Sequence, residues 1–137
     1  MANITTFNGG GGSFIKPKEL EGAKAILVEV TKFERQIPTD FGPKDQATAD
    51  LTVFNTDVAL ETGVPDQTLS NVKMQQTALA RDLQSYVGQA VVVSLGTGNA
   101  KPGRQAPWIW VPVPADVQQK VADYAKERDA ELDEAPI

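Results

Sequence analysis

The stretch AVVVSLGTGNAKPGRQAPWIWVPV, residues 90–113, organises the chain. It reads as a strand, a loop rich in glycine and proline, and a second strand. The loop carries Lys101 and Arg104 and no acid, although the whole chain has a net charge of −5. The only two tryptophans, Trp108 and Trp110, follow it directly. Cations beside aromatic rings are typical of a site that binds single-stranded nucleic acid, where phosphates meet the cations and bases stack on the rings. The alternative is that the loop is merely solvated and the tryptophans are packed in the protein.

Composition excludes several kinds of function. The 137 residues are 41% hydrophobic and 23% charged, which is typical of one globular domain. The chain has no histidine and no cysteine, and these residues supply most general bases, thiol nucleophiles and zinc ligands. We therefore expect no catalysis, no metal and no cofactor. An enzyme that uses carboxylates and magnesium is the remaining catalytic alternative, and the spacing of the acids indicates none.

Charge and hydropathy indicate where the chain acts. Residues 127–137 hold five acids and one base, a charge of −4, which leaves about −1 for the rest of the chain. The body is thus close to neutral, and the acidity is largely a C-terminal tail. No apolar run approaches the ~20 residues that cross a bilayer. The N-terminus also lacks the features of a signal peptide, so we expect a cytoplasmic protein.

Periodicity predicts five strands and two helices. The strands are expected at residues 23–33, 47–55 and 68–75 and at the two ends of 90–113, with helices at 77–88 and 115–132. Residues 1–13, which include four consecutive glycines, are predicted to be a flexible arm. Phe14 and Leu20 are expected to pack on the domain. The C-terminal helix has a narrow apolar stripe of Val117, Val121 and Tyr124, which could bury on its own domain or between two copies.

This order of elements is typical of the OB-fold, a mainly β, five-stranded Greek-key barrel. We expect the barrel to span residues 14–114, with a helix between its third and fourth strands. Residues 115–137 would add a C-terminal helix and the acidic tail. A β-sandwich or an SH3-like barrel is the alternative. OB-folds bind oligonucleotides on strands 2 and 3 and in the 1–2 and 4–5 loops, here residues 34–46 and 96–107.

The predicted binding residues are basic or aromatic. The basic residues on the predicted face and its loops are Lys32, Arg35, Lys44, Lys73, Lys101 and Arg104. The aromatic residues expected to point outward and to stack on bases are Phe33, Phe54, Trp108 and Trp110. The tryptophans could instead pack beneath a flanking segment. Glu29 and Asp50 share the predicted face and would repel phosphate.

Several sequence segments between Phe14 and Trp110 resemble segments of the OB-fold single-stranded-DNA-binding proteins of actinobacterial phages. They are FIKPKEL, AILVEVTKFERQIPTDFGPKDQATADLTVF, VKMQQTALARDL and PWIW. The resemblance implies a barrel that coats single-stranded DNA during phage replication or recombination, inside an infected bacterium. It would place DNA contacts on strands one to three and on the two loops.

The ending DEAPI is similar to the acidic tip with which bacterial single-stranded-DNA-binding proteins recruit replication partners. Asp133, Glu134, Pro136 and Ile137 would form that tip. The chain departs from the pattern because no long linker rich in glycine, proline or glutamine precedes the tip, and because the last residue is not aromatic.

The sequence therefore predicts a non-enzymatic, sequence-tolerant binder of single-stranded DNA that forms a homo-oligomer and does not contact membranes. Its affinity would come from phosphate contacts and stacking, and would fall steeply with salt. The alternative is an OB-like phage module that binds a host or virion protein and no DNA.

Overall fold

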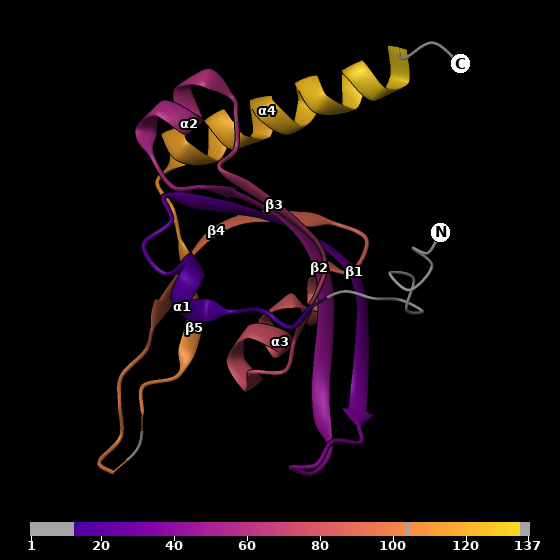
Figure 1. The fold of residues 1–137 in the computed structure, drawn as a ribbon, viewed down its shortest axis with the longest axis vertical. Helices are drawn as coiled ribbons and strands as arrows, with labels where there is room; N and C mark the ends of the chain where they lie inside the picture. The colour runs from indigo at the N-terminus through magenta and orange to yellow at the C-terminus, as the bar shows by residue number, and fades with distance from the viewer. Residues whose placement is uncertain (1–12, 104, 135–137) are drawn as a thin grey trace, which may run out of the picture.

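The computed structural model describes residues 13–103 and 105–134 (Figure 1). Five antiparallel strands form one sheet in the order β3-β2-β1-β4-β5. The elements are α1 (Pro17–Leu20), β1 (Ala25–Ile37), β2 (Lys44–Phe54), α2 (Asp57–Thr62), β3 (Gln67–Met74), α3 (Thr77–Leu83), the short 3₁₀ helix η2 (Gln84–Tyr86), β4 (Ala90–Thr97), β5 (Trp108–Pro112) and α4 (Ala115–Glu134). Of the predicted arm, only Ser13 is among the described residues. Arg104, Pro136 and Ile137, which were also predicted to be functional, lie outside the described residues.

The sheet curves strongly but does not close into a barrel. Its edges are β3 and β5, which do not pair with each other within the described part of the chain. Helix α3 lies within the curve of the sheet (Figure 1) and contacts both β2 and β5. The indole Nε1–H of Trp110 on β5 donates to the carbonyl of Leu79 on α3 at 3.1 Å. The mainly β class and the helix between the third and fourth strands are confirmed. The prediction of a closed barrel is wrong: β3 and β5 remain separate edges, and β5 packs against α3 instead of pairing with β3.

The predicted 34–46 loop is mostly strand. β1 continues to Ile37 and β2 begins at Lys44, so only six residues connect them. The prolines that indicated a loop, Pro38 and Pro43, lie just outside the paired residues. Irregular pairing in β1 accommodates its extra residues. The β1–β2 ribbon and the β4–β5 ribbon both extend toward the same end of the molecule, on either side of α3 (Figure 1).

Two hydrophobic clusters lie on opposite faces of the sheet. The inner cluster, on the concave face, contains residues of β1, β2 and β3 with Leu79 and Leu83 of α3 and Leu20 of α1. The outer cluster, on the convex face, joins Leu27 and Phe54 to α2 and α4. Because both faces are covered there, the first half of β1 is apolar at nearly every position rather than at alternate ones.

The C-terminal helix packs on its own domain. It begins at Ala115 as predicted and buries Val121 completely in the outer cluster. The ring of Tyr124 meets Phe54 edge-to-face, with 5.3 Å between ring centroids. Of the two ways in which the apolar stripe could be buried, the structure shows packing within one chain.

This packing predicts that Val121→Asp lowers the free energy of unfolding by about 3 kcal/mol, because a carboxylate would lose its water beneath the helix. Ala122→Asp, at the exposed neighbouring position, should change it by less than about 0.5 kcal/mol. Urea denaturation followed by tryptophan fluorescence measures both. Equal stability of the two variants would show that α4 does not pack here.

Candidate nucleic-acid interface

Four residues from four neighbouring backbone segments form a row across the outer face of the sheet. Phe14 bridges Lys73 of β3, Lys73 pairs with Thr48 of β2, and Thr48 pairs with Lys32 of β1. We call Phe14, Lys73, Thr48 and Lys32 the outer row. Because adjacent strands lie ~4.8 Å apart, the row is roughly 14 Å long. It places one aromatic ring, one hydroxyl and two ammonium groups along a single line.

Alternation along the strands directs the outer row away from the core. Ile15, Val72, Met74 and Ala47 are neighbours of the row residues in sequence, and all four are buried in the inner cluster. Since successive side chains point to opposite faces, the row faces outward. Phe14 is 56% exposed, and the side chain of Lys32 is 63% exposed.

Phe14 is held at the edge of β3 by its neighbours. The N–H of Lys73 donates to the carbonyl of Ser13 at 2.9 Å, and the N–H of Ile15 donates to the carbonyl of Lys73 at 2.8 Å. The buried side chain of Ile15 anchors the segment. The prediction that Leu20 packs on the domain is confirmed, whereas the same prediction for Phe14 was wrong. A single bridge sets its orientation, and no periodic pattern in the sequence signals that bridge.

The two acids expected to repel phosphate are engaged within the protein. The guanidinium of Arg128 on α4 donates to both carboxylate oxygens of Glu29, at 2.9 and 3.0 Å. These hydrogen bonds raise the pKa of Arg128 above its ordinary value. The carboxylate of Asp50 accepts from the backbone N–H of Asn71 at 2.9 Å. Both carboxylates are therefore less able to repel an anion bound at the outer row.

Lys44 extends the basic surface along the β1–β2 ribbon. It alternates with Gln46 and Thr48 on β2, so the three share the outer face. Gln46 is buried, and its amide oxygen accepts from the amide of Gln75 at 2.8 Å, so the residue between the two lysines of β2 and β3 is neutral and already paired. The carboxylate of Glu34 lies 3.6 Å from the ammonium of Lys32 and offsets part of the positive charge of the row.

The tryptophans do not face the outer row. Trp108 and Trp110 pack against the inner cluster, on the same side as the buried Leu95. The prediction that they point outward assumed that the aliphatic residues of β5 form its core face. In an open sheet the bulky rings instead fill the space beside α3, and the indole hydrogen bond fixes Trp110 there. Packing, the alternative left open by the sequence, is what the structure shows.

Phe33 and Phe54 are also unavailable for stacking in the way predicted. Irregular pairing at Thr31 shifts the alternation of β1, so that Lys32 faces outward and Phe33 packs on the inner cluster. The guanidinium of Arg35 lies 5.7 Å from the centroid of the Phe33 ring. Phe54 does lie on the outer face, but it is 1% exposed beneath α4.

Three further predicted residues within the described part of the chain, Lys101, Asp133 and Glu134, are apart from the outer row. Lys101 is exposed on the connection between β4 and β5. Asp133 and Glu134 belong to the last turn of α4. The structure thus brings Lys32, Lys73 and Lys44 onto one face and leaves Lys101 on a separate hairpin.

No protein-family model, no curated protein and no solved structure matches the chain. Among the described residues, no cluster of three or more acidic or metal-ligating side chains could hold a metal ion. No helix in the described part of the chain has the length and apolar character needed to span a bilayer.

The position of Trp110 predicts a variant that separates packing from binding. Trp110→Phe removes the hydrogen bond to Leu79 and should lower the free energy of unfolding by about 1–2 kcal/mol. Its affinity for an oligo-dT strand, measured by anisotropy of a labelled strand, should stay within about twofold of the wild type, because the ring lies against the core. A large loss of affinity in a folded variant would return Trp110 to the binding surface.

Proposed function

We propose that this protein binds single-stranded DNA without sequence preference and has no enzymatic activity. The observation that carries the proposal is the outer row, in which an exposed phenylalanine and two lysines are aligned across neighbouring strands. A ring can stack on any base, and the lysines can pair with backbone phosphates. No side chain of the row is placed to distinguish one base from another by paired hydrogen bonds, so the binding would tolerate any sequence.

The strand arrangement supports an OB-like fold as part of this proposal. The OB-fold is a partly open five-stranded barrel that uses the face of strands 2 and 3. Here Lys73 and Thr48 of the outer row lie on β3 and β2, and α3 follows β3 as expected for that fold.

The protein would coat or protect DNA during phage replication or recombination in the cytoplasm of an infected bacterium, as a homo-oligomer. Recruitment of replication proteins through Asp133, Glu134, Pro136 and Ile137 remains a prediction.

Charge reversal on the outer row tests the proposal directly. Lys32→Glu combined with Lys73→Glu should weaken oligo-dT binding at least about tenfold at low salt, since two phosphate contacts become repulsive. The slope of log affinity against log salt should fall in magnitude by about 1.4, or about 0.7 for each lost phosphate.

A matched control carries the same change in net charge elsewhere. Lys24→Glu with Lys126→Glu alters two exposed lysines outside the outer row and should reduce affinity much less. If both double variants weaken binding equally, the effect comes from net charge and the row is not the site. If the wild-type protein does not bind oligo-dT at tens of micromolar (about −6 kcal/mol), the proposed function is wrong.

Phe14 supplies the stacking part of the proposal. Phe14→Ala should cost about 1–3 kcal/mol of binding free energy, the range measured for one base stacked on one ring. The exposed ring makes little contribution to the core, so the thermal midpoint should stay nearly unchanged. Phe14→Trp should retain affinity and should report binding by quenching of the new indole. An unaltered affinity of Phe14→Ala would leave the row with phosphate contacts alone.

The β4–β5 hairpin is the second expected contact. Lys101→Glu combined with Arg104→Glu should weaken oligo-dT binding without changing the free energy of unfolding, because Lys101 is exposed and forms no part of the core. Titration with strands of increasing length would show whether this loss appears only with longer strands. Undiminished binding to long strands would confine the site to the outer row and the β1–β2 ribbon.

A further inference from the structure

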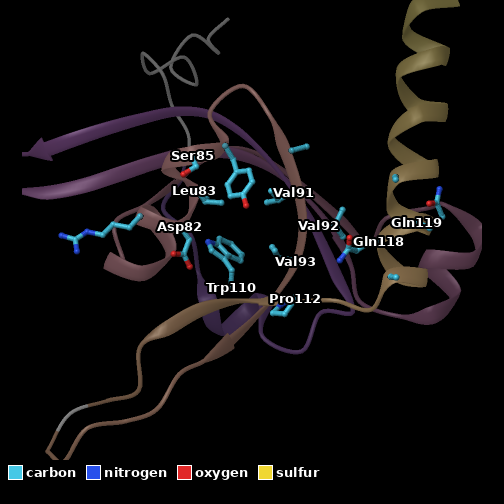
Figure 2. A pocket seen from close by; sticks show the side chains of 15 residues that line it. Asp82, Leu83, Ser85, Val91, Val92, Val93, Trp110, Pro112, Gln118 and Gln119 are labelled. Atoms are coloured by element: carbon cyan, nitrogen blue, oxygen red, sulfur yellow. The ribbon is translucent and has the colours of Figure 1, made fainter.

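A groove with a volume of about 1000 Å³ lies along the edge of β4 at its beginning, between α3, η2 and α4 (Figure 2). Residues 90–93 of β4 form its floor, and Trp110 and Pro112 of β5 close one end. None of the residues proposed to contact DNA lines the groove except Trp110, which is partly buried and packs against the inner cluster rather than facing the outer row. The groove is therefore a surface separate from the proposed DNA site.

The groove exists because β5 leaves β4 early. β5 pairs only with the stretch Val93–Thr97, and after Pro112 the chain turns into α4. Pro112 and Pro114 have no N–H to donate to a longer ladder. The carbonyl of Val113 accepts from the side chain of Gln118 instead, at 3.1 Å. The beginning of β4 consequently has no neighbouring strand on this side among the described residues.

The unpaired backbone groups belong to Ala90 and Val92. Along a strand, the N–H and C=O groups of alternate residues point to opposite edges. The carbonyl of Gln89 accepts from β1 at 3.0 Å, whereas the N–H of Gly98 donates across to the β5 side at 2.8 Å. Pairing of β4 is regular on both edges. The even-numbered residues therefore point toward β5, so Ala90 and Val92 direct two N–H and two C=O groups into the groove.

The two walls of the groove have different chemistry. Figure 2 shows Val91 and Val93 directed toward Trp110 and Leu83, and Val92 directed to the opposite side, toward Gln118. The wall formed by α4 is made of alanine and glutamine. The wall formed by α3, η2 and β5 is mixed: its apolar and aromatic part is Leu83, Tyr86, Trp110 and Pro112, and its polar part is Arg81, Asp82 and Ser85. A strand added to β4 would present alternate side chains to these walls.

Charge and shape restrict what can occupy the groove. Among its fifteen lining residues, only Arg81 and Asp82 are charged, with opposite signs, and Arg81 also lies 3.7 Å from Asp45. An uncharged occupant is therefore favoured on a chain in which 23% of the residues are charged. The edge is also recessed between two helical walls. A second copy would bring its own two walls to the contact, whereas an isolated extended segment brings none, so we take an extended segment as the occupant that fits within the ~4.8 Å of a paired strand.

We propose that this groove binds an extended, uncharged segment of a partner protein by strand addition to Ala90 and Val92. The partner segment would carry apolar side chains at the positions that face Trp110 and Leu83. It would carry small polar side chains at the positions that face α4. Main-chain hydrogen bonds to β4 supply affinity, and the unlike walls set the register. The inference does not depend on DNA binding.

The test uses the full chain labelled with ¹⁵N and a blocked hexapeptide, Thr-Val-Ser-Val-Ser-Val, as the probe. At about 1 mM peptide, a range suited to weak strand addition, the amides of Ala90 and Val92 should shift and their hydrogen exchange should slow several-fold. The amides of Val91 and Val93 already bond to β1 and should change little. Methylating the peptide nitrogens that face β4 should abolish binding, whereas methylating the alternate nitrogens should not.

A steric variant supplies the protein-side control. Ala122→Trp places a large side chain in the groove from the exposed face of α4 and should weaken peptide binding at least tenfold. Ala130→Trp, on the same helix outside the groove, should leave binding unchanged. The proposal is overturned if Ala90 and Val92 do not respond to the peptide, if they are already protected in the free monomer, or if both variants bind it equally.

Discussion

Burial of β1 on both faces is the constraint on which the rest of the structure depends. From Ala25 to Val30 the strand is covered by the inner cluster on one side and by α2 and α4 on the other, and it pairs with both β2 and β4. No ligand can reach either face of this half of β1. Beyond the irregular pairing at Thr31, β1 is no longer buried on both faces. The irregularity shifts which side chains point to each face, and α2 and α4 do not cover the outer face there. The free outer face begins there, and with it the outer row.

The ion pair between Glu29 and Arg128 stands at the boundary of these two halves. It joins α4 to β1 where the covered surface gives way to the exposed one. Being partly exposed, the pair contributes modestly to stability. Its larger effect is on the electrostatic potential, since it neutralises a carboxylate on the same face of the sheet as the outer row. In a chain whose body is close to neutral, the placement of such pairs decides which surface attracts an anion, more than net charge does.

Sequence patterns predicted the elements better than the faces of those elements. The sequence was sufficient to predict the strands, the two longer helices and the packing of Leu20. Hydrophobic periodicity and the positions of glycine and proline depend on local structure, which is why these features could be predicted. Phe33 was assigned to the wrong face because one extra residue at Thr31 reverses a period-2 pattern. Trp108 and Trp110 were misassigned because their environment depends on the open sheet and on α3. Closure of a barrel requires two edges distant in sequence to meet, and no local pattern encodes whether they do.

The tether of Phe14 has a thermodynamic consequence. Its ring is positioned by backbone hydrogen bonds to Lys73, which is also a cation of the same row. Any ligand that contacts both residues stabilises the state in which Phe14 is paired with Lys73. That pairing in turn strengthens binding of the ligand by the same free energy. Opening of the segment Ser13–Ile15 and binding at the row are therefore linked equilibria. Affinity at this surface can be tuned by the stability of a three-residue edge, without altering any group that touches the ligand.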